Sequence, residues 1–395
     1  MRSSNLPERH RMPKLRRLEP ARVHEFVQGL FAEDMHAKRV LSLGNGVVGV
    51  MYAASLSVHA IGVGLAIAQE LTAKHAVKQV DRLMSNTKLD VGEALCTWVP
   101  FIIGERQEVV IALDWTEFDA DDQATLAAYL ITNHGRATPL AWKTVKKSEL
   151  KDARNDHEDA LLLRLRKVIP RKVRVTILAD RGFGDQELYR FLTEIGWDYA
   201  IRFRGCIEVC DKSDEAKPAI DWLPPSGRAT MLKEVEVTQD RTPVPAVVLV
   251  HAARMKDAWC IATSRSDLGA PSIVKLYSRR FTIEESFRDQ KDPRFGLGLS
   301  ATHTKTCERR DRLLFMAAIA ESLLTLLGAA GEAAGLDRLL KVNTSKRRQH
   351  SLFRQGLMWY ALLPGLKEER ARLLMQHFDG LVAAHKVFRD IFGVL

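Results

Sequence analysis

Residues 108–114 read EVVIALD and residues 173–180 read VRVTILAD, and these two runs decide the fold class. Both are short and rich in valine, isoleucine and leucine, which is the composition of strands buried on both faces of a sheet. The first run ends in Asp114 and the second in Asp180. Because open α/β sheets carry their sites beyond the carboxyl ends of the strands, both aspartates are candidate site residues.

The segments around these strands alternate between strand and helix patterns. The predicted elements are a hairpin within 124–147, an amphipathic helix at 157–168, a helix at 186–195 and a strand at 199–204. This β-β-β-α-β-α-β order predicts a ribonuclease-H-like α/β core. Residues 206–257 lose the helical pattern and are rich in proline and valine, so we expect a β-rich insertion there.

A polar helix is predicted further along the chain, where residues 277–291 read YSRRFTIEESFRDQK. No glycine or proline interrupts the stretch, and Leu276, Ile283 and Phe287 recur at helical spacing. These apolar residues form a stripe that would face the core.

One edge of this helix carries the residue types that a metal-dependent phosphate site needs. At about 3.6 residues per turn, a stripe about 60° wide contains a phenol, a guanidinium, a carboxylate and an ammonium group. The four residues are Tyr277, Arg280, Glu284 and Lys291. Glu285 points elsewhere, so Glu284 is the candidate acid. The alternative is an ordinary surface helix whose Arg280 and Glu284 form an i,i+4 charge pair.

The spacing Y-x2-R-x3-E-x6-K of this stripe resembles the signature of the insertion-sequence-four family of DDE cut-and-paste transposases. Two further motifs strengthen the resemblance. IEESFRD-x-K followed by FGLGL (Phe295–Leu299), and HAVKQVDRLMSN at residues 75–86, resemble the branch that carries the bacterial tetracycline-resistance composite transposon.

Asp114, Asp180 and Glu284 form the three-carboxylate set that the resemblance implies as the DDE metal ligands. Hard oxygen ligands suit Mg²⁺, or Mn²⁺ as its substitute, rather than zinc. Two such ions about 4 Å apart activate the nucleophilic oxygen and stabilise the leaving oxygen of an in-line phosphoryl displacement. We therefore expect two ions in each active site.

The resemblance also implies a set of DNA contacts. Trp259 matches a family tryptophan that stacks on a flipped base beside the cleavage site, where an aromatic surface offsets the lost base stacking. A core tryptophan at the start of a strand is the alternative. Arg202, on the strand after Asp180, resembles the family's phosphate-binding arginine. The residues predicted to contact DNA around the carboxylates are Tyr277, Arg280, Lys291, Arg202, Trp259 and Arg288.

The implied function is that of a DNA transposase, an endonuclease and strand transferase acting on double-stranded DNA. It would nick each terminal inverted repeat, form and open a hairpin, and join the element to target DNA. The family acts as a synaptic homodimer, so we expect a dimer on DNA and no membrane partner. Two alternatives stay open: a catalytically silent transposase-derived DNA-binding protein or repressor, and a ribonuclease-H-like nuclease unconnected to transposition.

The first 98 residues predict a helical, basic DNA-binding domain. Helices are expected at 21–32, 47–54, 58–68 and 73–84, and the second and third form a helix–turn–helix. One side of the fourth helix is basic, which favours contact with duplex DNA, although an ordinary solvated helix face is the alternative. The basic residues on that side are Lys74, His75, Lys78 and Arg82.

Composition favours a polyanionic partner. The 395 residues carry a net charge of +10 with a pI near 9.4, and 46% are hydrophobic, enough for real cores. Five scattered cysteines form no disulfide framework, so we expect a reducing compartment. The polar, basic N-terminus predicts no signal peptide, and hence the bacterial cytoplasm in association with the nucleoid.

Residues 40–69 lack Asp, Glu, Lys and Arg over a length that could span a bilayer. Gly44, Asn45 and Gly46 interrupt the run, so two short buried helices joined by a turn are the better prediction. Past residue 300 the pattern is helical again, at 311–326, 337–340, 358–363 and 367–392.

The predicted organisation has five parts. They are the N-terminal DNA-binding domain (1–98), the first part of the ribonuclease-H-like core (99–205), the β-rich insertion (206–257), the second part of the core with the polar helix (258–345), and a helical C-terminal region that is a candidate for dimerisation (346–395).

Overall fold

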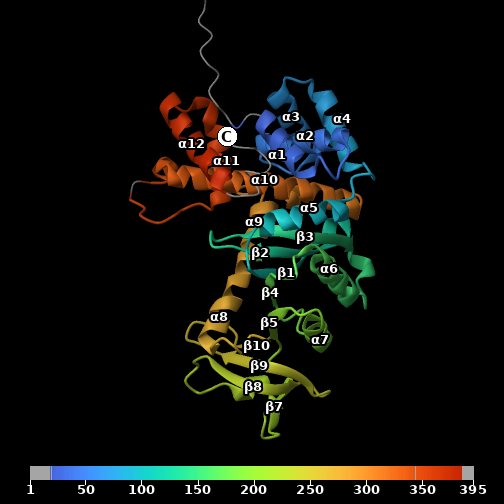
Figure 1. Ribbon diagram of the computed structural model, residues 1–395, viewed down its shortest axis with the longest axis vertical. Coiled ribbons are helices and arrows are strands. Elements are labelled where there is room, and N and C mark those ends of the chain that lie inside the picture. The colour runs from blue at the N-terminus through green and yellow to red at the C-terminus, as the bar shows by residue number, and fades with distance from the viewer. Residues whose placement is uncertain (1–17, 19, 343, 385–395) are drawn as a thin grey trace, which may run out of the picture.

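The chain folds into a layer of helices at one end and a long sheet that extends away from it (Figure 1). The computed structural model describes residue 18 and residues 20–342 and 344–384. The N-terminal segment of the signal-peptide prediction lies outside these residues. So does the end of the helix predicted at 367–392.

Five helices precede the sheet: α1 (Pro20–Phe31), α2 (Ala37–Ala53), α3 (Val58–Gln69), α4 (Ala73–Met84) and α5 (Val91–Ile103). The predictions for α1, α3 and α4 are confirmed, because their apolar residues recur at helical spacing and are buried on one face. α5 is absent from the sequence-based prediction. Pro100, a residue that usually ends a helix, lies inside it.

α2 corrects the prediction for residues 40–54. The helix begins at Ala37 and runs unbroken through Gly44, Asn45 and Gly46. These glycines mark close packing, not a turn: a Cβ on Gly44 would lie 2.4 Å from the His24 ring, and one on Gly46 would lie 2.3 Å from the sulfur of Met316. The predicted turn follows at residues 54–57, and α3 departs from α2 at an angle of 96°.

The described strands form one ten-stranded sheet in the order β3-β2-β1-β4-β5-β10-β9-β8-β6-β7. Its first six strands are β1 (Glu108–Phe118), β2 (Gln123–Ile131), β3 (Ala137–Lys146), β4 (Arg174–Ala179), β5 (Asp198–Phe203) and β10 (Trp259–Thr263). β1, β4 and β5 are parallel, and α6 (Arg154–Val168) and α7 (Gln186–Glu194) lie in the connections between them. This mixed α/β arrangement is consistent with the predicted ribonuclease-H-like core.

The position of Asp114 within β1 differs from the prediction. The strand does not end at Asp114 but continues to Phe118, because β2 pairs with it antiparallel through Phe118 and Gln123. The parallel pairing with β4 ends earlier, at Ala112 and Leu178. Asp114 therefore lies where β1 leaves its parallel neighbour, while Asp180 directly follows β4 as predicted.

The predicted β-rich insertion forms β6 (Glu208–Cys210), β7 (Ala216–Pro218), β8 (Thr230–Val237) and β9 (Thr242–Val250). β9 pairs with β10, so the insertion lengthens the core sheet instead of forming a sheet of its own. In Figure 1 it lies at the end of the molecule opposite the helical layer.

The chain returns to the helical layer through α10 (Cys307–Ala333), α11 (Leu352–Leu362) and α12 (Glu368–Ala384). In Figure 1, α10 lies between α1 to α4 on one side and α5 with the sheet on the other. By length and composition α10 could cross a membrane, but 78% of its most apolar window is buried inside the protein, as in a core helix. Arg22 of α1 forms an ion pair with Asp379 of α12, which joins the first and last described helices in one layer.

Candidate active site

The predicted helix at residues 277–291 is built from three pieces. They are α8 (Ala270–Ser278), a 3₁₀ turn η4 (Arg279–Phe281) and α9 (Thr282–Lys291). A 3₁₀ turn holds about 3.0 residues instead of 3.6, so the polar stripe of an ideal α-helix is not preserved intact. Of the four residues in that stripe, Arg280 and Glu284 contact each other. Tyr277 instead packs against Trp259, and Lys291 bonds the Glu117 carbonyl.

Arg280 lies between two of the predicted metal ligands. Its Nη1 donates to Asp114 Oδ2 at 3.2 Å, and its Nη2 donates to Glu284 Oε1 at 2.6 Å. The Arg280 side chain is 6% exposed and that of Glu284 is 48% exposed, so the group is reached from solvent on the Glu284 side. The predicted i,i+4 pair of Arg280 and Glu284 therefore exists. Arg280 also bonds a carboxylate from the sheet, that of Asp114.

Asp180 joins this group through its charge. Burial raises the pKa of Asp114 to about 6, Arg280 opposes that rise, and the charges of Asp180 and Glu284 add to it. Asp180 Oδ1 itself accepts a hydrogen bond from the Gly182 amide at 2.8 Å, which orients the carboxylate at the start of the loop after β4. The three acids predicted from sequence thus share one electrostatic neighbourhood.

The donor set at this place suits a divalent cation of the hard type. Its three carboxylates repel one another, and a cation among them would relieve that repulsion. The described residues contain no preassembled cluster of three or more His, Cys, Asp or Glu side chains. The guanidinium of Arg280 lies between Asp114 and Glu284 and forms an ion pair with each.

Tyr277 is buried, contrary to what its place in the polar stripe suggests. It is 1% exposed, and burial is the main cause that raises the pKa of its phenol. Its ring meets the Trp259 ring edge to face, with 5.1 Å between centroids. The charge of Arg280 opposes that rise in pKa, so Tyr277 contributes to the site as a buried neighbour of Arg280 and Trp259.

Trp259 and Phe281 form an aromatic shelf beside the carboxylates. Their ring centroids lie 5.9 Å apart with the planes tilted by 35°. Trp259 is half-buried at the start of β10, and Phe281 is 40% exposed in η4. Phe281 is absent from the sequence-based site. An aromatic residue directly after Arg280 on the polar helix is the signal that could have included it.

Arg202 lies at the same edge, on β5. Its Nη2 donates to the Ala258 carbonyl at 3.0 Å and lies 3.9 Å from Asp257 Oδ2, so it holds the segment that leads into Trp259. Its charge also acts on the phenol of Tyr277. The structure therefore brings Arg202 close to Tyr277 and the shelf.

Lys291 lies at the other end of α9, beside the end of β1. Its Nζ donates to the Glu117 carbonyl at 3.1 Å and lies 4.6 Å from the centroid of the Phe118 ring. The guanidinium of Arg310, which sequence reasoning missed, lies 3.7 Å from the same centroid and forms an ion pair with Asp121. This cluster anchors the strand that carries Asp114.

Five further residues were predicted to contact DNA, and all of them are exposed. Arg288 is exposed on α9 and donates to Glu285 at 2.9 Å. The basic residues of α4 are all exposed, on a helix that Figure 1 places in the helical layer, away from α8. They are Lys74, His75, Lys78 and Arg82.

One further buried carboxylate, also missed, lies on the opposite face of β1 from Asp114. Glu158 of α6 accepts a hydrogen bond from the Trp115 indole at 2.7 Å, next to Asp114 in the chain. Burial raises the pKa of Glu158 to about 7. Arg154 lies 5.0 Å from the centroid of the Trp115 ring, so α6 holds β1 on the side away from Asp114.

Comparison with known families agrees with this geometry. Residues 105–322 match the family model described as "Transposase DDE domain", and they include all three carboxylates together with Arg280. No curated protein matches the chain. The matched segment is more than half of the 395 residues and spans β1 to α10. The chain therefore belongs to the transposase DDE domain family.

Proposed function

We propose that this protein is a cut-and-paste DNA transposase of the insertion-sequence-four type. The observation that carries the proposal is the arrangement of Asp114, Arg280 and Glu284, with Asp180 in electrostatic contact, inside the segment that matches the family. Such a carboxylate set beside a buried guanidinium suits phosphoryl transfer, where negative charge must be balanced at the reacting phosphate.

Asp114, Asp180 and Glu284 would hold the divalent ions, with Mg²⁺ as the physiological cation and Mn²⁺ as its substitute. When bound, these ions activate the attacking oxygen and stabilise the leaving oxygen. Arg280 bonds both Asp114 and Glu284 and offsets part of their negative charge. Its Nε is buried and has no hydrogen-bond partner among the described residues.

The surroundings of the carboxylates supply DNA-binding groups. The aromatic shelf of Trp259 and Phe281 offers a surface on which an extruded base can stack, as hairpin formation requires. Arg202 supports this shelf from β5, and Lys291 carries a positive charge beside β1. The exposed basic face of α4 would grip the duplex away from the cleavage point.

The partners of this activity are the terminal inverted repeats of the element and the target DNA. We propose a homodimer in the synaptic complex, with the helical C-terminal region as part of the interface, and a place in the bacterial cytoplasm at the nucleoid. The nicking, hairpin and strand-transfer steps would all use the one carboxylate site, because each is a phosphoryl transfer with a different oxygen nucleophile.

Cleavage of DNA that carries the inverted repeats tests the proposal. Wild-type protein with Mg²⁺ is expected to nick at the ends, and Asp180→Asn to lower the rate by about a hundred-fold or more. Asp119→Asn is the matched control, because Asp119 is 76% exposed and pairs with Lys147. Wild-type protein that binds the ends but never nicks them would refute the proposal and favour a transposase-derived repressor.

A further inference from the structure

The helix that carries Glu284 is held by an unusual set of polar contacts on its other side. Glu284 is exposed on the side of α9 that carries the Arg280 contact. On the other side, Ser286 is 5% exposed and Gln290 is 3% exposed. Ile283 and Phe287 are the buried apolar residues of α9. Hydrogen bonds are directional, so they determine the rotation of a helix about its axis more strictly than apolar contacts do.

Ser286 ties α9 to the first residue of β3. Its hydroxyl accepts a hydrogen bond from the Ala137 amide at 2.9 Å and lies 2.9 Å from the Ala137 carbonyl and 2.9 Å from the Thr282 carbonyl. The single hydroxyl proton serves one of these carbonyls at a time. Because Ser286 follows Glu284 by two positions, its contact with the strand limits the rotation of both.

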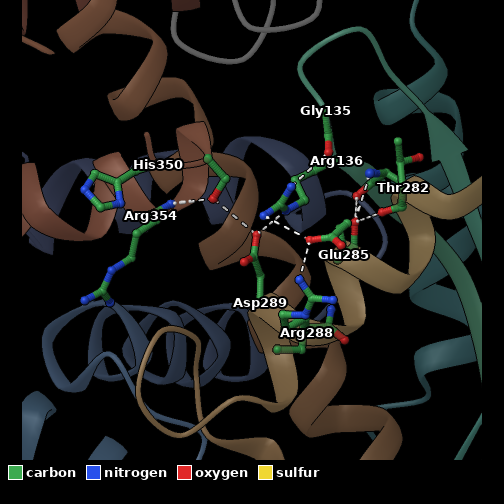
Figure 2. Close-up of polar contacts among 12 residues, drawn as sticks. Gly135, Arg136, Thr282, Glu285, Arg288, Asp289, His350 and Arg354 are labelled. Carbon is green, nitrogen blue, oxygen red and sulfur yellow. Dashed lines mark hydrogen bonds and ion pairs between the residues drawn. The ribbon is translucent and has the colours of Figure 1, made fainter. Parts of the chain in front are cut away.

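Arg136, from the turn between β2 and β3, reaches α9 from the same side. Its Nε donates to Asp289 Oδ2 at 2.7 Å, and its Nη2 lies 3.7 Å from Glu285 Oε2. Figure 2 shows the guanidinium between these two acids, with Glu285 also bound to Arg288. Asp289 is only 14% exposed on its side chain, so this pair is more than a solvated surface contact.

Asp289 also connects α9 to the C-terminal region. The Ser351 hydroxyl lies 3.3 Å from Asp289 Oδ2 and accepts a hydrogen bond from the Arg354 amide at the start of α11. Figure 2 shows this chain of contacts running from Arg136 through Asp289 to the first turn of α11. One carboxylate thus receives hydrogen bonds from a core turn and from a C-terminal helix.

Packing alone does not hold this side of α9. A cavity of about 560 Å³ adjoins Arg136, Ser286 and Asp289, between the β2–β3 turn, α10 and the loop before α11. A helix beside a cavity lacks close-packed neighbours there, so its orientation depends on the polar contacts that remain.

We propose that Arg136 and Ser286 are positioning residues that orient the Glu284 carboxylate toward Asp114. They act through α9, and neither side chain bonds Asp114, Asp180 or Glu284 among the described residues. The inference rests on the proposed function for the role of Glu284. A displacement of a reacting group by about 1 Å is enough to slow catalysis by about a hundred-fold, so small rotations of α9 matter.

The test compares Arg136→Gln, Arg136→Lys and Ser286→Ala with Arg241→Gln. Arg241 is the matched control, because it also bonds two carboxylates, Asp214 and Glu236, but lies in the insertion. Cleavage of inverted-repeat DNA gives kcat and KM. Thermal unfolding with increasing Mg²⁺ gives a readout independent of activity.

Arg136→Gln and Ser286→Ala are expected to lower kcat by about a hundred-fold, leave KM for DNA unchanged, and require more Mg²⁺ for the same rise in Tm. Arg136→Lys should restore part of kcat, and Arg241→Gln should match wild type. Unchanged kcat, or a change in KM alone, overturns the inference. If Arg136→Gln does not fold, Asp289→Asn replaces it in the test. This variant keeps the shape of the Asp289 side chain and weakens its ion pair with Arg136, and the same changes in kcat and KM are expected.

The two proposals fail in different ways. If wild-type protein does not cleave DNA, the proposed function fails. If wild-type cleavage depends on Asp114 and Glu284 while Arg136→Gln and Ser286→Ala retain full kcat, only the positioning role fails.

Discussion

The guanidinium of Arg280 bonds Asp114 at 3.2 Å and Glu284 at 2.6 Å, so a single buried cation joins a residue of the sheet to a residue of α9. This contact offsets part of the repulsion between Asp114 and Glu284 across the site. A divalent ion bound by the same acids would do the same, and Arg280 therefore acts as their counter-ion when metal is absent.

Replacing Arg280 separates these two roles. Arg280→Ala leaves Asp114 buried with an uncompensated charge, which should lower stability in EDTA by about 3 kcal/mol. Mg²⁺ should then raise the Tm of the variant more than that of wild type, because the ion replaces the lost positive charge. Thermal unfolding across a Mg²⁺ titration measures both effects.

Arg265→Ala is the control for this experiment. Arg265 is also buried, at 7% exposure, and also bonds two carboxylates, Glu108 and Asp267. Its removal should lower stability without changing the response to Mg²⁺. An equal Mg²⁺ response in wild type and Arg280→Ala would show that Arg280 is no counter-ion to the metal ligands.

Trp259→Ala should affect one step of the reaction more than the others. Without this ring the aromatic shelf loses its larger part, and base–aromatic stacking contributes about 1–3 kcal/mol. We expect hairpin formation to slow by about ten-fold or more while the first nick persists, as measured by separate product bands on denaturing gels. Trp259→Phe, which keeps a ring, should recover most of the rate of hairpin formation. If Trp259→Ala instead slows nicking as much as hairpin formation, the substitution has damaged the core and not only the aromatic shelf.

Glu321 of α10 predicts a pH dependence of stability. Burial raises its pKa to about 8, and its Oε2 accepts a hydrogen bond from Gln290 of α9 at 3.1 Å. In the unfolded chain the pKa returns to the ordinary value near 4.5. Between these values the folded protein keeps a proton that the unfolded chain releases, so the free energy of unfolding falls as pH rises from about 4.5 to about 8.

Glu321→Gln should remove this dependence, because the amide oxygen still accepts from Gln290 and carries no charge. The variant should match wild type near pH 4.5 and exceed it at pH 8 by about 2–5 kcal/mol in denaturant unfolding. Glu368→Gln, on the exposed start of α12, is the control. A variant less stable than wild type at pH 8 would contradict the assignment of a neutral carboxyl group.

The basic face of α4 predicts a salt dependence of DNA binding. Replacing Lys74, Lys78 and Arg82 together by alanine should weaken binding to any duplex and reduce the slope of log K against log salt by about 2–3, since each phosphate contact contributes about 0.9. The measurement is affinity for a short duplex at several salt concentrations. Replacing Arg370 and Arg372 of α12, together with Lys367 directly before it, removes the same charge elsewhere and should leave the slope unchanged.

Local patterns were sufficient for much of this protein. Residue type and periodicity were enough to predict the buried strand before Asp180, the α4 helix and the β-rich insertion. In each case the pattern of apolar residues shows which side chains of that same segment are buried. The spacing along residues 277–291 likewise identified Arg280 and Glu284 as neighbours. The order of strands and helices was enough to predict the α/β class.

Other features depend on partners far away in the chain. β1 continues past Asp114 because β2 pairs with it, and the glycines of α2 lie inside a helix because His24 and Met316 approach them. Sequence alone therefore predicted which acids and which elements would form the site. Only tertiary structure decided that Arg280 would bridge two of those acids and that Arg136 would hold α9, since both contacts join segments more than 140 residues apart.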